Sequence, residues 1–85
     1  MRFLIAATKG MKRMKLNYYN DTDSLYIELS GNPSVDSLEV APNLVIDFDK
    51  DQNIVGIDID HATKHLNLSE LELGHMPTVK VLLSK

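Results

Sequence analysis

The 85-residue chain is long enough for one small domain and too short for two. Its 44% hydrophobic and 25% charged residues are typical of a soluble globular domain, and its lack of cysteine excludes disulfides, Cys-based zinc sites and thiol nucleophiles, which fits a reducing cytoplasm. The net charge of -3 and the lack of a long apolar run lead us to expect neither a nucleic-acid partner nor a membrane span.

Residues 1–13 form a basic and apolar N-terminal arm. Positions 1–20 hold five basic residues and no acidic one, whereas the remaining positions hold four basic and twelve acidic residues. The apolar run 3–7 is shorter than the ~7–15 residues of a signal peptide and is followed at once by basic residues. We expect the arm to be an extra amphipathic strand or helix, or an extension translated from an upstream start. Residues 14–85 are expected to form a single small β-rich domain.

An alternation of apolar and polar side chains predicts a first β-hairpin. The alternation runs through residues 15–18 and 24–29, on either side of a polar turn at 20–23. A four-residue turn pairs Tyr18 with Leu25, which places apolar side chains opposite one another on one face.

A second antiparallel unit is predicted after Gly31-Asn32-Pro33 interrupts the chain. We expect strands at residues 37–40, 44–49 and 54–59, the last two joined by the polar loop 50–53. Three cross-strand pairs are predicted for these last two strands, namely Phe48 with Val55, Ile46 with Ile57 and Leu44 with Ile59. A glycine weakens a strand unless the backbone bulges or something approaches closely, so Gly56 predicts a bulge or a ring of Tyr26 or Tyr19 lying over it.

After Ile59 the pattern favours a short helix. Asp60 is placed to cap a helix beginning at His61, and the Ser-x-x-Glu spacing of residues 69–72 predicts a second helical turn. Residues 78–83 are rich in β-branched and apolar side chains and predict a last strand. The fold class is therefore α+β: an antiparallel β-meander of five to six strands, with one short helical segment after Ile59 packed on one face.

The acidic loop resembles a calcium-binding loop in its spacing. Oxygen-bearing side chains fall at alternate positions, and Asp58 falls at position twelve of such a loop. The alternating positions are Asp47, Asp49, Asp51 and Asn53. Gln52 stands where the sharp turn requires glycine, and both flanks are predicted strands. We therefore favour the interpretation that Asp47 and Asp49 lie on the solvent face of a hairpin.

His61 and His65 lie four residues apart on the predicted helix, as metal ligands do. Asp58 or Asp60 could supply a nearby carboxylate. The glutamate of a metalloprotease signature is missing, because Ala62 occupies its position, and His75 lies in a loop that we cannot place. A metal site at the acidic loop or at these histidines stays an alternative.

No pattern indicates catalysis. The serines lack a glycine-elbow context, the acidic residues show no spacing typical of a shared active site, and no glycine-rich phosphate loop is present. Tyr18, Tyr19 and Tyr26 would stack nucleic-acid bases only within a positive groove, and their strands are close to neutral. We expect neither an enzyme nor a bound cofactor.

Three segments together carry a family resemblance: residues 18–27 (YYNDTDSLYI), 45–49 (VIDFD) and 54–59 (IVGIDI), followed by Ala62. In this combination the chain resembles the small prokaryotic domain-of-unknown-function family 2283, over residues 14–66. It departs from the family pattern at Asn20, where aspartate is common, and at Asp58, where glutamate is common. The resemblance implies a compact β-rich fold without an established activity. Family members are suspected of accompanying small toxin-like genes, which implies an antitoxin-like partner of a small basic toxin as an alternative role.

We expect a non-enzymatic protein-binding or self-associating module. A domain of this size is only marginally stable without disulfides or metal, and a meander exposes edge strands. Residues 78–83 and 3–7 are apolar and suited to pair with an edge. These features predict a homo-oligomer joined through the C-terminal strand, the N-terminal arm or both.

Overall fold

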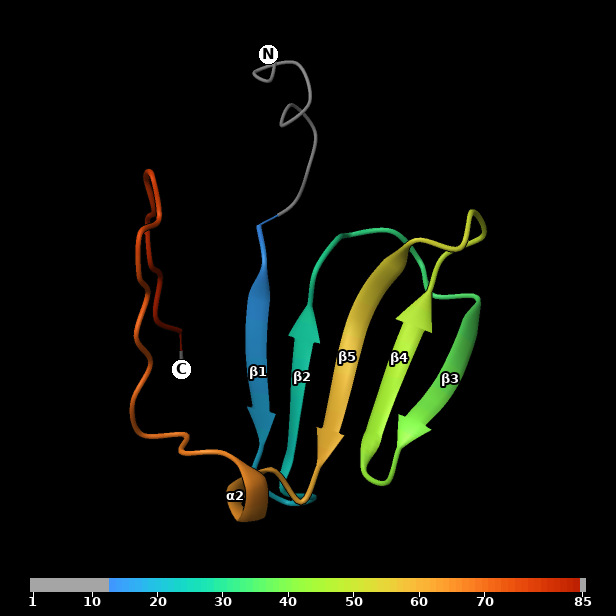
Figure 1. The fold of residues 1–85 in the computed structure, drawn as a ribbon, viewed down its shortest axis with the longest axis horizontal. Coiled ribbons are helices and arrows are strands. Elements are labelled where there is room, and N and C mark those ends of the chain that lie inside the picture. The colour runs from blue at the N-terminus through green and yellow to red at the C-terminus, as the bar shows by residue number, and fades with distance from the viewer. Residues whose placement is uncertain (1–12, 85) are drawn as a thin grey trace.

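The computed structural model describes residues 13–84, so the prediction for the N-terminal arm falls almost entirely outside the described residues. Five antiparallel strands form one open sheet in the order β1-β2-β5-β4-β3 (Figure 1). The strands are β1 (Lys15–Tyr19), β2 (Ser24–Glu28), β3 (Asp36–Ala41), β4 (Leu44–Phe48) and β5 (Ile54–Asp60), followed by the one-turn helix α2 (Ala62–His65). The predicted α+β class with a β-meander is confirmed.

The first hairpin attaches to the meander β3-β4-β5 along β5 rather than in sequence order. The connection from β2 to β3 therefore crosses the ends of β5 and β4 to reach the opposite edge (Figure 1). Backbone hydrogen bonds hold this crossing, because Leu29 N donates to Val55 O at 2.9 Å and Val35 N donates to Phe48 O at 2.8 Å. β1 and β3 are thus the two edge strands.

The register of the first hairpin is the predicted one. Tyr18 lies opposite Leu25 and Leu16 lies opposite Ile27. Asp23 ends the turn in the left-handed region, with φ of 53°. Aspartate tolerates this region better than most residues, which explains why the polar turn can close here.

The second hairpin has the predicted register except at its open end. Leu44 lies opposite Ile59 and Ile46 opposite Ile57, but Phe48 lies opposite Ile54 rather than Val55. The register shifts between Asp47 and Phe48, so Val55 is the extra residue of a bulge. Val55 is only 3% exposed, and its carbonyl oxygen accepts the hydrogen bond that holds the β2–β3 crossing.

The predicted cap of the helix is wrong. Asp60 is the last residue of β5, and His61 precedes α2 with φ of 55° and no side-chain cap. The free N–H groups of α2 are instead satisfied by Asp23, whose backbone oxygen accepts from Ala62 N and whose Oδ1 accepts from Thr63 N at 3.2 Å. Ala62 is fully buried where the helix meets the turn.

Residues 66–84 follow α2 and are named here the C-terminal segment. They contain no helix or strand. The second helical turn at 69–72 and the last strand at 78–83 were predicted wrongly. Ser69 N and Oγ bond the Oδ1 of Asn67 instead. In Figure 1 the segment runs on the β1 side of the sheet. Its apolar side chains are exposed, namely Leu66, Leu68, Leu71, Leu73, Met76, Val79, Val81, Leu82 and Leu83.

The sheet has little core of its own. Among the described residues, the only buried hydrophobic side chains are those of Leu25, Val55 and Ala62. A sheet normally packs its apolar face against another layer, and here neither α2 nor the C-terminal segment forms one. Within residues 13–84 no helix has the length and apolar character of a membrane span.

Candidate functional site

Two rows of apolar side chains cross all five strands on one side of the sheet. Alternate residues of a strand point to the same face, so the cross-strand pairs place these rows side by side. We call this surface the apolar face; its rows are Leu16, Ile27, Ile57, Ile46 and Leu38, and Tyr18, Leu25, Ile59, Leu44 and Ala41. The phenol of Tyr18 is the only ionisable group in these rows.

The apolar face is open to solvent, most of all at its two edges. Leu16 on β1 is 48% exposed and Leu38 on β3 is 55% exposed, while all but one of the side chains between them are half-buried. Five strands of five residues span about 24 by 17 Å, or roughly 400 Å². The largest apolar patch of a typical monomer covers about 300–600 Å² and is often functional, so the apolar face is a candidate binding surface.

The opposite side of the sheet carries carboxylates and is named the acidic face. Its rows alternate with those of the apolar face and contain Glu28, Glu39, Asp47, Asp58 and Asp60, with Lys15 at the β1 edge. Burial raises the pKa of Asp58, and the neighbouring charges of Asp60 and Asp47 raise it further. Negative charge is therefore concentrated on this face of the sheet.

A tyrosine clamp lies across the centre of the acidic face. Tyr26 Oη donates to Asp47 Oδ2 at 2.8 Å, and Ser37 Oγ donates to Asp47 Oδ1 at 2.6 Å. The ring passes over Gly56, where a β-carbon would collide with the Oη and Cζ atoms of Tyr26. Both predicted explanations for Gly56 are thus confirmed, because the ring of Tyr26 lies over it and a bulge occurs at the adjacent Val55. Burial and the bond to Asp47 raise the pKa of Tyr26 to about 12, so its phenol stays protonated at neutral pH.

Asp23 joins the apolar face to α2. Tyr18 Oη donates to Asp23 Oδ1 at 2.8 Å, and Thr63 Oγ1 donates to Asp23 Oδ2 at 2.8 Å. The hydrogen bond from Tyr18 is the main cause that lowers the pKa of Asp23, and the same bond raises the pKa of Tyr18. No local pattern predicts this role, because Asp23 and Thr63 are forty residues apart.

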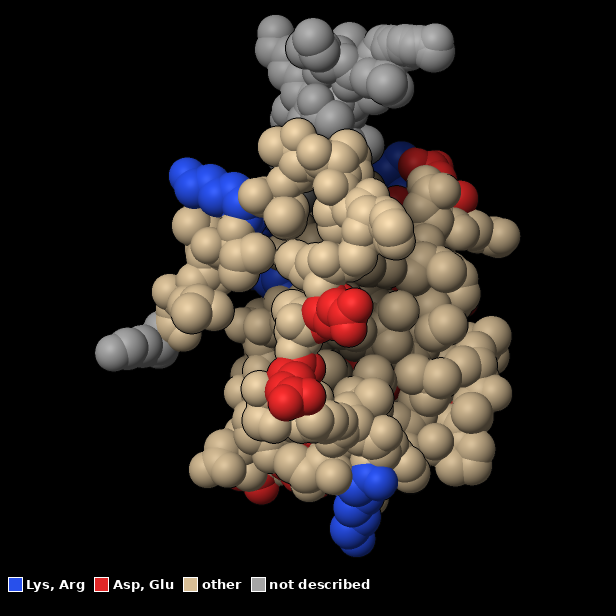
Figure 2. All heavy atoms as spheres, turned by 60° about the vertical axis from the view of Figure 1, so that its left-hand side comes forward, with Lys and Arg blue, Asp and Glu red and all other residues tan. Residues whose placement is uncertain are grey.

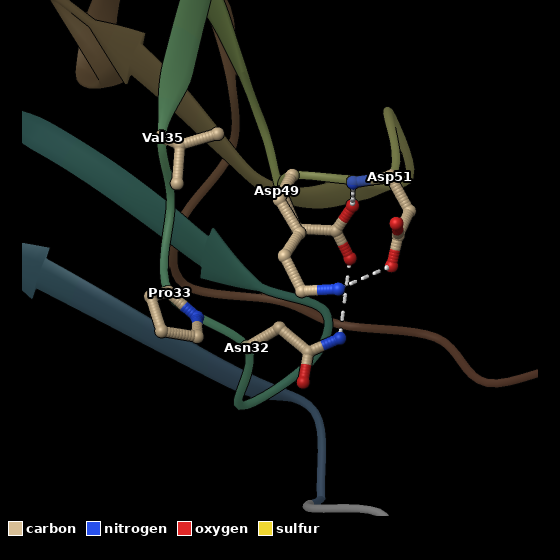
Figure 3. Close-up of a pocket in the computed structure, with 6 residues that line it drawn as sticks. Asn32, Pro33, Val35, Asp49 and Asp51 are labelled. Carbon is tan, nitrogen blue, oxygen red and sulfur yellow. Dashed lines mark hydrogen bonds and ion pairs between the residues drawn. The ribbon is translucent and has the colours of Figure 1, made fainter.

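Asp49 is a structural carboxylate, and its predicted position on the solvent face is wrong. It is 5% exposed, and its Oδ1 accepts from Asn53 N at 2.9 Å. Figure 3 shows two further bonds, in which Asp51 N donates to Oδ1 at 2.9 Å and Asn32 Nδ2 donates to Oδ2 at 3.2 Å. The bond from Asn53 N is the main cause that lowers the pKa of Asp49. These bonds hold the β4–β5 turn against the β2–β3 crossing. Aspartate followed by a polar loop commonly bonds the backbone two residues on, which is the signal that could have predicted this role.

The hollow at this turn offers no free acidic oxygen of Asp49 to a ligand. It is lined by Asn32, Pro33, Val35, Asp49, Lys50 and Asp51 (Figure 3). Lys50 Nζ and Asp51 Oδ2 form an exposed ion pair at 3.2 Å, the kind that contributes little to stability.

The predicted metal ligands do not converge. Within residues 13–84 no group of three or more His, Asp or Glu side chains is placed to hold a metal ion. Asp47 and Asp49 accept hydrogen bonds from their own chain, and His61 Nδ1 lies 3.0 Å from Asn43 Oδ1. The remaining candidates, Asp51, Asp58 and His65, lie in the turn, on β5 and at the end of α2.

The two histidines also fail to share a helical face. His61 lies outside α2 in the left-handed region, whereas His65 is the last residue of the helix. His75 lies in the C-terminal segment with φ of 58°. The spacing of four residues predicts a common face only when both residues are helical.

A family model described as "Protein of unknown function (DUF2283)" matches residues 15–62, which is more than half of the chain. The chain belongs to this family. The DUF2283 match covers all five strands and the first residue of α2, and the resemblance predicted from the sequence is confirmed.

The chain is also similar to the uncharacterised protein MJ0789 of Methanocaldococcus jannaschii, with 31% identity over 61 residues. The match covers 72% of this chain and 52% of that protein, so the chain spans about half the length of this curated relative. No solved structure matches the chain significantly. The family is described as one of unknown function, so membership of DUF2283 does not assign a function to the chain.

Proposed function

We propose that this DUF2283 domain is a non-enzymatic protein-binding module whose working surface is the apolar face. The observation that carries the proposal is a contiguous apolar surface that crosses all five strands and has little cover. An apolar sheet face is normally buried against another layer, and exposing it costs free energy in proportion to its area. A partner that covers the face would recover that free energy.

The chemistry of the titratable groups supports a non-enzymatic role. The carboxylates of Asp23, Asp47 and Asp49 accept hydrogen bonds from their own chain, and the phenol of Tyr26 stays protonated. Such groups hold turns and strands together rather than facing a substrate. We expect the module to act in the cytoplasm, in keeping with its lack of cysteine.

The acidic face favours a second candidate function. Five carboxylates on one face of a small sheet would attract a basic protein, as an antitoxin-like partner of a small basic toxin requires. Binding through this face would weaken with added salt, whereas binding through the apolar face would not.

Site-specific photo-crosslinking in the native host separates the two functions. A photoreactive amino acid replaces Leu38, on the apolar face, or its neighbour Glu39, on the acidic face of the same edge strand. We expect protein adducts from position 38 and few from position 39. Adducts from position 39 alone would favour the basic partner, and adducts from neither position would refute a binding module.

A further inference from the structure

We infer that the occupant of the apolar face is a second copy of this chain. Two copies pack apolar face against apolar face, and the C-terminal segments of both complete the interface. The inference rests on the proposed function and names its partner. Sheets pack in this way at a separation of about 10 Å in β-sandwiches, where each sheet supplies the second layer that the other lacks.

The distribution of charge favours a second copy. The two rows of the apolar face contain no carboxylate and no ammonium group, although the chain as a whole has a net charge of -3. When two copies meet through this face, both acidic faces point outward and no like charges are brought together. A surface without charged groups offers a charged partner nothing to pair with, but it is complementary to itself, as a two-fold symmetric interface requires.

The area of the surface indicates that the C-terminal segment takes part. A stable interface buries about 800 Å² on each partner, and the apolar face supplies roughly 400 Å². The C-terminal segment adds exposed apolar side chains, such as that of Val81, which is 58% exposed. With the β1 side turned forward, most of the described surface is uncharged, with two neighbouring acidic patches near its centre (Figure 2).

Residues 78–81 alternate as in an edge strand of the same sheet, although Leu82 then places an apolar side chain on the polar side. Val79 and Val81 alternate with Thr78 and Lys80, which matches a strand with one apolar side and one side that can face carboxylates. The segment forms no strand in the single copy. Both edge strands of the single copy, β1 and β3, are left without it, and pairing with the edge of a second copy would extend the sheet.

Analytical ultracentrifugation of the full chain tests the inference. We expect the wild type to sediment as a dimer at low micromolar concentration. Leu16→Asp and Leu38→Asp should each raise the dissociation constant at least about tenfold, because each places a charge in the interface. Tyr19→Asp is the matched control. It adds the same charge to the same strand as Leu16→Asp, at a residue that is 49% exposed but lies on the opposite face. Circular dichroism confirms that each variant keeps its sheet.

The C-terminal segment and the salt dependence provide two further readouts. Val81→Asp should weaken the dimer, and added salt should leave the dissociation constant unchanged or lower it, since both copies are negatively charged. An unchanged dissociation constant for Val81→Asp would refute the role of the segment. A wild type that stays monomeric at high micromolar concentration would overturn the inference.

The photo-crosslinking adducts distinguish this failure from failure of the proposed function. An adduct from position 38 with twice the mass of the chain identifies the second copy. An adduct from position 38 with a different protein would overturn self-association while leaving the apolar face as a binding surface. No adduct from position 38 would overturn both.

Discussion

Replacing Gly56 by alanine should break the tyrosine clamp on the acidic face. The β-carbon of the alanine would fall on the Oη and Cζ atoms of Tyr26, so the rigid ring would have to swing away from the sheet. Its hydrogen bond to Asp47 would then be lost, together with the packing of the half-buried ring on the strand. An aromatic ring that covers a strand glycine is a recognised way to stabilise such a glycine.

The loss follows from two opposing contributions. A hydrogen bond to a charged group contributes about 1.5–3 kcal/mol, and alanine in a strand regains about 0.5–1 kcal/mol relative to glycine. The net destabilisation is therefore about 0.5–2.5 kcal/mol. For a domain of this size, that corresponds to a fall in Tm of roughly 2–20 °C.

A double-mutant cycle measures this coupling. Thermal and urea unfolding are followed for the wild type, Gly56→Ala, Tyr26→Ala and the double variant. Without the ring, Gly56→Ala should be neutral or slightly stabilising, which gives a coupling free energy of about 1–3 kcal/mol. If Gly56→Ala raised the Tm of the wild type, or cost as much in the Tyr26→Ala background, the clamp would not have the role assigned here.

Two carboxylates predict opposite pH effects. The pKa of Asp58 is raised above 3.8, so its ionised form disfavours the folded state. Asp58→Asn should therefore stabilise the protein at pH 7 by no more than about 1 kcal/mol, and the gain should disappear below pH 3.8. An equal gain at both pH values would contradict the burial argument. The pKa of Asp49 is lowered, so its contribution is present above pH 3.8 and is lost as the pH falls through its folded value. Asp49→Asn should lower the Tm at pH 7, and the deficit should narrow below pH 3.8; an unchanged Tm at pH 7 would show that the turn does not depend on the carboxylate.

The strands and most of their register could be predicted because a period of two leaves few choices. Once Tyr18 faces Leu25, a shift of one residue would turn every apolar side chain of β2 to the opposite face. The same argument aligned Ile46 with Ile57. Gly56 was informative because a glycine in a strand needs a local reason, and the ring of Tyr26 supplied it.

The remaining features depend on contacts that a local pattern does not contain. Asp23 replaces Asp60 as the helix cap because the turn between β1 and β2 lies beside α2. Asp49 is buried because the β2–β3 crossing brings Asn32 against it. Residues 78–83 have the composition of a strand but pair with neither edge of the sheet, because composition does not specify a pairing partner.

The apolar sides of the two hairpins could be predicted from the alternation of side chains. The lack of a second layer packed over them could not. Alternation placed Leu16 and Ile27 on one side of the first hairpin and Ile57 on one side of the second, and the register puts both sets on the same face of the sheet. Whether a second layer covers that side depends on where the C-terminal segment packs. The helical and strand patterns after Ile59 predicted such a layer, and the structure holds only the single turn of α2.

Intermolecular NMR contacts test the central claim most directly. Wild-type protein labelled at its methyl groups is mixed with unlabelled protein, and filtered nuclear Overhauser spectra then record contacts between copies only. The account predicts intermolecular contacts at the methyl groups of Ile46 and Ile57, on the apolar face, and none at Val45, which neighbours Ile46 but lies on the acidic face. Contacts at Val45 without contacts at Ile46 and Ile57 would contradict it.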